Sequence, residues 1–105
     1  LFANITTDFN AAIVTRVAAF HHPATVVHVF DVNAVYKHHV FPKFTAPDAS
    51  NACLNATSLV VCDDPDKHIY WDVFHPTRVV HEVIGRAFAE FVREHGASAA
   101  YGGGY

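Results

Sequence analysis

The segment ATVVHVFD, residues 24–31, decides the fold class that this sequence predicts. It is short, rich in β-branched residues and almost continuously apolar, which is typical of a strand covered on both faces. His28 alternates with valines here, so we interpret it as a satisfied core or near-surface histidine. A buried strand needs neighbours for its amide and carbonyl groups, so we expect the rest of a sheet to lie outside this chain.

Helical patterns lie on both sides of this predicted strand. Residues 7–20 predict an amphipathic helix that ends before Pro23, and residues 32–41 predict a short second helix. Pro76 is expected at the first position of a last helix, where its missing amide costs nothing. The apolar side chains of this last helix recur at helical spacing: Val80, Val83, Ile84, Ala87, Phe88 and Phe91. Gly96 fits its end.

The order of the predicted elements indicates an α/β fold, part of a three-layer α/β/α arrangement with an incomplete sheet. A long loop over residues 42–67 and a brief strand over residues 68–72 separate the second helix from the last one. We expect residues 1–96 to be the end of a larger domain and residues 97–105 to be a flexible tail. The chain begins with Leu1 and contains no methionine, which we interpret as a processed piece or a fragment.

Composition and charge narrow the range of functions. The chain has 105 residues and 51% hydrophobic content, which is too apolar for a disordered protein. Its 10 acidic and 7 basic residues give a formal net charge of −3 with neutral histidines. This balance offers no reason to expect nucleic acid or an anionic membrane surface as a partner. No apolar run reaches the roughly 18 residues that a membrane-spanning helix needs.

Two cysteines and two glycosylation sequons bear on the compartment. Cys53 and Cys62 lie in the long loop and are either two buried free thiols or a disulfide. The sequons at Asn4 (NIT) and Asn55 (NAT) favour the disulfide, because such acceptors are used only in the secretory pathway. We therefore expect a Cys53–Cys62 disulfide, glycosylation at both asparagines and a secreted protein.

The nine histidines form no recognisable metal-binding motif. His21 and His22, like His38 and His39, are adjacent in sequence, so their side chains point in different directions rather than converging. HExxH and CxxC spacings are both absent from the sequence. We expect neither a metal site nor an organic cofactor.

The segment WDVFHPT, residues 71–77, contains the residue types of an acid–base pair. Asp72 and His75 lie three residues apart, and Pro76 restricts the backbone of the residue before it. Serine esterases need a base to take the hydroxyl proton and a carboxylate to fix the base's tautomer and stabilise its cation. The same residues also fit a second interpretation, in which they form a capped helix start without a catalytic role.

Residues 62–92, CDDPDKHIYWDVFHPTRVVHEVIGRAFAEFV, closely resemble the last motif block of the GDSL-type esterases and lipases, the SGNH hydrolase superfamily. In that family a cysteine, a proline, an aromatic pair and the motif D-x-x-H-P-T precede the C-terminal helix. DFNAAI followed by ATVVHVFDV also resembles the family's helix–strand passage, which extends the resemblance to about residues 7–95. The sequons and cysteine loop are most like those of secreted fungal members, some of which act on acetylated carbohydrates.

The resemblance implies the C-terminal portion of an SGNH hydrolase domain that cleaves carboxylic esters, with Asp72 as catalytic acid and His75 as base. The substrate would be a small-molecule or carbohydrate ester. Ser50, Ser58 and Ser98 lie in the loop or the tail and lack the setting of the family's nucleophile. The serine and oxyanion-hole motifs are therefore expected in a missing N-terminal part of the same domain, and this chain alone is expected to be inactive. The alternative is a non-catalytic secreted binding module on a hydrolase-like scaffold.

Overall fold

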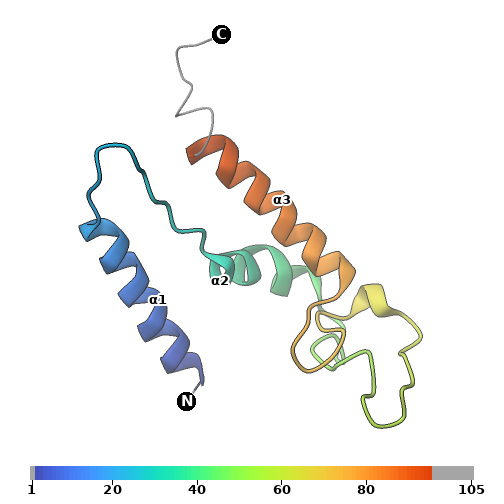
Figure 1. Ribbon diagram of the computed structural model, residues 1–105. Coiled ribbons are helices and arrows are strands. Elements are labelled where there is room, and N and C mark those ends of the chain that lie inside the picture. Colours follow the sequence, from blue (N-terminus) through green and yellow to red (C-terminus); the bar gives the residue numbers. More distant parts are fainter. Residues whose placement is uncertain (1, 96–105) are drawn as a thin grey trace. The chain divides into compact units, whose positions relative to one another are not determined.

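The computed structural model describes residues 2–95 of the chain, with side chains from residue 4 onward. The chain forms two compact units, residues 1–30 and residues 31–105 (Figure 1). The predicted tail over residues 97–105 and the helix stop at Gly96 lie outside the described residues.

The structure is helical, and the predicted α/β fold is wrong. Residues 24–31 form no strand, and both Val26 and His28 in this segment are exposed. In the described part of the chain, pairing outside the helices is limited to isolated bridges such as His22 with Thr25, and no sheet forms. A β-branched apolar segment becomes a strand only where neighbouring strands accept its hydrogen bonds, and this part of the chain supplies none. The three-layer α/β/α arrangement with an incomplete sheet is therefore wrong as well.

Helix α1, Phe2–Ala19, makes up most of the first unit. The predicted helix over residues 7–20 is confirmed, although it begins earlier, at Phe2. Ile5 and Phe9 are 55% and 63% exposed, and none of the side chains of residues 4–30 is buried. These residues therefore form no hydrophobic core of their own.

The second unit begins with a continuous helical rod of three short elements. These are α2 (Val32–Val35), the π-helical η1 (Tyr36–Val40) and the 3-10 helix η2 (Phe41–Lys43). Asp31 caps the rod, because its Oδ1 accepts a hydrogen bond from the amide of Ala34 at 3.0 Å. The predicted short helix at this position is confirmed.

Helix α3, Arg78–His95, confirms the predicted last helix but begins later than the sequence indicates. Pro76 was expected at its first position. The structure instead pairs Pro76 with Tyr70 in an antiparallel bridge, so the proline belongs to the turn that leads into α3. The helix then starts at Arg78, and its last turn contains Arg93, whose charge suits the negative end of a helix dipole.

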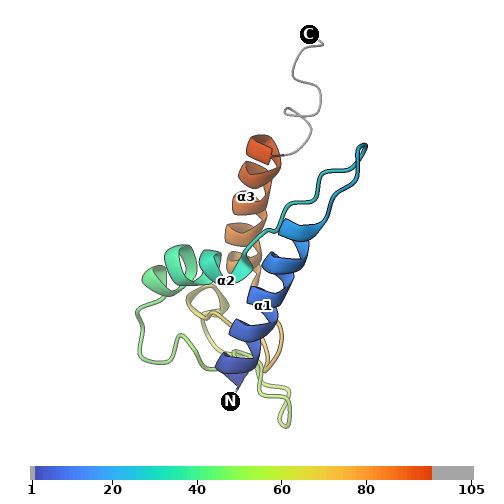
Figure 2. The ribbon, with the colours of Figure 1, turned by 90° about the vertical axis from the view of Figure 1, so that its left-hand side faces the viewer.

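A small hydrophobic core fastens the rod to α3. Two elements of the rod, α2 and η1, contact α3, and the rod crosses α3 (Figure 1, Figure 2). Val40 from η1, Ile69 from the chain before α3, and Val80 from α3 are buried and pack together. Partly buried side chains pack around this core: Tyr36, Phe44, Tyr70, Val83 and Ile84. The core therefore anchors the segment that immediately precedes α3.

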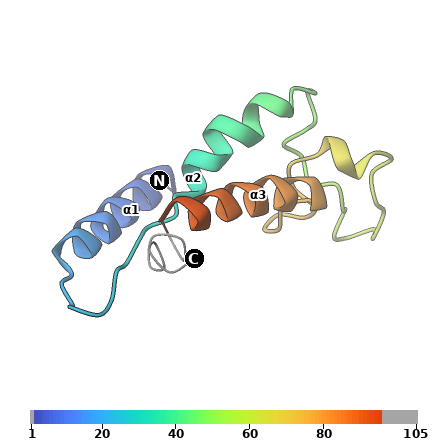
Figure 3. The ribbon, with the colours of Figure 1, turned by 90° about the horizontal axis from the view of Figure 1, so that it is seen from above.

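The long loop predicted over residues 42–67 is confirmed in most of its length. Residues 44–64 contain no helix, and η3, Pro65–Lys67, is a single 3-10 turn. This part of the chain gathers at the N-terminal end of α3 (Figure 3). The predicted disulfide is also confirmed: Cys53 and Cys62 are bonded, with 4.9 Å between their Cα atoms. Residues 53–62, which the disulfide closes, are called the cysteine loop below.

Candidate functional site

Residues 70–76 form a closed turn just before α3. The ends of the turn pair in an antiparallel bridge, and the Trp71 amide donates to the carbonyl oxygen of His75 at 2.8 Å. At the base of the turn, the Thr77 amide donates to the carbonyl oxygen of Ile69 at 2.9 Å. The turn is thus anchored to the core through Ile69.

The brief strand predicted over residues 68–72 does not form, but this segment is hydrogen-bonded to two other parts of the chain. It is bonded to the long loop: the Ile69 amide donates to the carbonyl oxygen of Ala49 at 2.8 Å, and the carbonyl oxygen of Tyr70 accepts from the Cys53 amide at 3.0 Å. It is also bonded to the returning arm of the turn, through His75 and Thr77. The predicted strand is therefore wrong: Ile69, Trp71 and Asp72 lie in bends, Tyr70 forms only an isolated bridge, and the neighbours of this segment are loop residues rather than strands.

Asp72 and His75 lie side by side within this turn. The imidazole Nδ1 of His75 is 2.8 Å from Oδ2 and 3.0 Å from Oδ1 of Asp72. Asp72 Oδ1 also accepts the backbone amides of Phe74 at 2.8 Å and of His75 at 2.6 Å. Because a carboxylate only accepts hydrogen bonds, this contact assigns the ring proton to Nδ1 and leaves the lone pair of the neutral ring on Nε2.

Hydrogen bonding also explains the charge state of the acid. The His75 and Phe74 amides and the His75 ring lower the pKa of Asp72 from 3.8 to about 2. The carboxylate is therefore ionised at neutral pH. Its side chain is 26% exposed and that of His75 is 72% exposed, so the base lies on the solvent side of the turn. Such an arrangement orients the imidazole while leaving Nε2 accessible to a reacting group.

Acid is expected to loosen this turn between the ordinary pKa of Asp72, 3.8, and its folded value of about 2. The folded pKa is the lower one, so the carboxylate stabilises the fold above pH 3.8, and this contribution is lost as the pH falls through the folded value. In an NMR titration, the amide signals of Phe74 and His75 should move in this window. Asp72→Asn should abolish the movement, and Asp63→Asn, at an exposed loop position, should not. If these amide signals moved with a midpoint at the ordinary pKa of 3.8, the prediction would be contradicted.

Asp72 does not cap the last helix. The amides that it accepts belong to Phe74 and His75, both before α3 begins. Thr77, the residue preceding the helix, is 2% exposed, and its hydroxyl donates to the carbonyl oxygen of His68 at 2.8 Å. The interpretation of Asp72 and His75 as a capped helix start is therefore wrong, since both residues instead close the turn.

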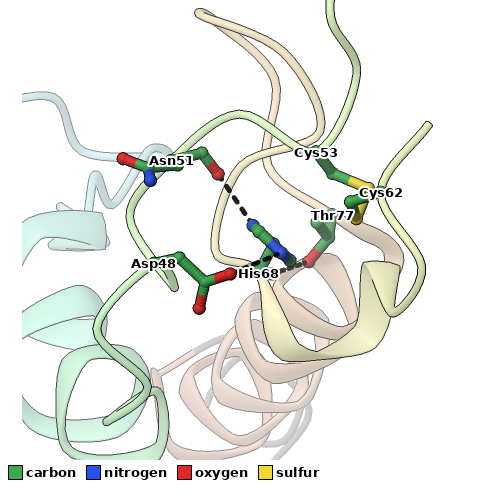
Figure 4. Close-up of a disulfide and its surroundings, with 6 residues drawn as sticks. All are labelled: Asp48, Asn51, Cys53, Cys62, His68 and Thr77. Atoms are coloured by element: carbon green, nitrogen blue, oxygen red, sulfur yellow. Dashed lines mark hydrogen bonds and ion pairs between the residues drawn. A yellow bond between two sulfur atoms is a disulfide. The ribbon is translucent and has the colours of Figure 1, made fainter. Parts of the chain in front are cut away.

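Sequence reasoning did not single out His68, which is buried in the structure, with 7% of its surface exposed. Its Nδ1 is 2.9 Å from the carbonyl oxygen of Asn51, and its Nε2 is 3.8 Å from Oδ2 of Asp48 (Figure 4). Together with the bond from Thr77, these contacts join the long loop to the start of α3. No sequence signal distinguishes His68 from the other histidines, because its burial depends on loop residues distant in the chain.

The remaining candidate residues lie apart from the Asp72–His75 pair. In the described structure neither Ser50 nor Ser58 is hydrogen-bonded to His75, and Ser98 lies outside the described residues. Residues 2–95 contain no group of three or more histidine, cysteine or acidic side chains placed to hold a metal ion. None of the helices in that range is long and apolar enough to cross a membrane.

The chain matches no protein-family model, no curated protein and no solved structure. The resemblance to GDSL-type esterases therefore stays a prediction, which rests on the motif residues of the sequence.

Proposed function

We propose that Asp72 and His75 are the acid and base of a serine esterase of the GDSL type, which cleaves carboxylic esters. The observation that supports this function is the contact of 2.8 Å between His75 Nδ1 and Asp72 Oδ2, on a side chain that is 72% exposed. A carboxylate in this position fixes the tautomer of the imidazole and stabilises the imidazolium that forms during the reaction. The other ring nitrogen then takes the proton from a serine hydroxyl.

The proposed reaction uses His75 as a proton shuttle. Nε2 accepts the serine proton as the serine oxygen attacks the ester carbonyl carbon, and the tetrahedral intermediate collapses to an acyl-enzyme. His75 gives that proton to the departing alcohol oxygen. Water then attacks the acyl-enzyme in the same manner, which releases the carboxylic acid and restores the serine. Asp72, with its pKa of about 2, stays ionised throughout.

This reaction requires a serine hydroxyl next to Nε2 and donors for the oxyanion. Neither Ser50 nor Ser58 makes a hydrogen bond to His75 in the described structure, so we assign the nucleophile to an N-terminal part of the same domain that these residues do not include. The chemistry needs only acid–base groups and hydrogen-bond donors, and therefore implies no cofactor. The expected substrate is a small-molecule or carbohydrate ester.

We also propose that the protein is secreted, which the Cys53–Cys62 disulfide supports. Asn55 is exposed and directly precedes the turn of the cysteine loop, and its Oδ1 accepts the amides of Thr57 and Ser58 at 3.0 Å each. Asn4 lies within α1. Because glycosylated sequons are typical of surface loops, we expect fuller occupancy at Asn55 than at Asn4 when the protein passes through a eukaryotic secretory pathway. Glycopeptide mass spectrometry measures both, and an unmodified Asn55 in the secreted protein would contradict the prediction.

A fluorophosphonate probe, which labels activated serines, tests the esterase function. We expect the 105-residue chain to remain unlabelled and the intact protein that contains it to take up one label per molecule. Labelling of the isolated chain at Ser50, Ser58 or Ser98 would overturn the assignment of the nucleophile. An intact, folded protein with neither labelling nor ester turnover would support the non-catalytic binding module instead.

A further inference from the structure

The cysteine loop is hydrogen-bonded to the chain that leads into Asp72. The Cys53 amide donates to the carbonyl oxygen of Tyr70 at 3.0 Å, and the Leu54 amide donates to that of Trp71 at 2.7 Å. Trp71 immediately precedes Asp72 in the sequence. A displacement of the loop amides is therefore passed to the backbone of the acid within one residue.

The disulfide closes the cysteine loop into a short hairpin. The Cys62 amide donates to the carbonyl oxygen of Cys53 at 2.8 Å, and Leu54 pairs with Val61 in an antiparallel bridge. Near its tip, Leu59 has a φ of 58°, in the left-handed region that a residue with a Cβ adopts at a cost. A two-stranded hairpin of this length is marginal without further support. The covalent bond between the two cysteines supplies that support, and it adjoins the amides that contact the turn.

We propose that the Cys53–Cys62 disulfide is a positioning element for the Asp72–His75 pair. It holds the amides of Cys53 and Leu54 against the carbonyl oxygens of the segment before Asp72, and so keeps the carboxylate opposite His75. The catalytic meaning of this inference rests on the proposed esterase function. The geometric part is independent of it and is measurable in the chain itself.

The position of the bond indicates that its effect is local. Ile69 connects the same segment to the core with Val40 and Val80, and its carbonyl oxygen holds the Thr77 amide. These contacts do not involve the cysteine loop. Opening the disulfide should therefore disturb the Asp72–His75 contact more than the core.

The test uses the ¹⁵N chemical shifts of the His75 ring, which report its tautomer, and the titration midpoint of Asp72. In Cys62→Ala we expect the Nδ1–H tautomer of the neutral ring to fall at least about threefold relative to the Nε2–H form, because its partner is no longer fixed. The Asp72 midpoint should move from about 2 toward 3.8. Val60→Ala, at an exposed site in the same loop, is the matched control and should change neither reading.

A second variant removes the Leu54 amide and leaves the disulfide in place. Leu54→Pro keeps both cysteines but removes the N–H that donates to the carbonyl oxygen of Trp71. It should therefore lower the share of the Nδ1–H tautomer of His75, as Cys62→Ala does. An unchanged tautomer and Asp72 midpoint in either variant, with the core intact, would overturn the proposal. If Cys62→Ala unfolds the core, Leu54→Pro decides the question. Failure of the esterase function would appear separately, as turnover that survives His75→Ala.

Discussion

Replacing His75 by alanine in the intact enzyme is expected to lower kcat for ester hydrolysis by at least about 10⁴-fold. The variant loses the group that accepts the serine proton and returns it to the leaving alcohol. Its fold should survive, because the His75 side chain is 72% exposed and its hydrogen bonds to Asp72 lie within the turn. Steady-state hydrolysis of a chromogenic acetate ester measures the loss, and circular dichroism checks the fold.

Two further variants make this result specific. His81→Ala removes another exposed histidine near the start of α3 and should leave kcat nearly unchanged. Asp72→Asn should reduce kcat less than His75→Ala but still substantially. The asparagine carbonyl oxygen can still accept the hydrogen bonds of the Phe74 and His75 amides. Its NH₂ group then lies opposite Nδ1 of His75, where it would face a second donor. The ring therefore favours the Nε2–H tautomer, which cannot accept the serine proton at Nε2. Near-normal turnover in a folded His75→Ala enzyme would contradict the catalytic role.

The helices and the disulfide of this protein were predictable because their signals are local. The apolar residues of α3, from Val80 to Phe91, recur at helical spacing, and that regularity is enough to identify a helix. The segment at residues 24–31 carries an equally clear strand signal and forms no strand. A strand depends on hydrogen bonds to chain that is distant in sequence, so its own composition cannot establish it.

In the candidate site, too, the local contact was predictable from the sequence and the contacts with distant residues were not. The contact between Asp72 and His75 was predictable, because three residues and a following proline bring the two side chains to one turn. The support from Cys53 and Leu54 was not, because it consists of backbone amides, which carry no sequence signal of their own. The disulfide itself was predicted, but the hydrogen bonds between its loop and the turn were not.

The second large effect concerns stability, and we expect it from Ile69→Ala. This substitution should lower the free energy of unfolding by about 2 to 4 kcal/mol, the usual cost of truncating a buried isoleucine to alanine. Ile69 is 3% exposed and packs with Val40 and Val80 in a core that has few other members. Since small domains have only about 5 to 15 kcal/mol of net stability, the loss would be a large part of the total.

Urea unfolding followed by the fluorescence of Trp71, the only tryptophan in the chain, measures this change. Trp71 lies in the turn itself, so its signal reports on the segment that Ile69 anchors. Val73→Ala is the control, since Val73 is 76% exposed and its truncation should alter stability by less than about 0.5 kcal/mol. A loss below about 1 kcal/mol for Ile69→Ala would show that the core does not anchor the turn.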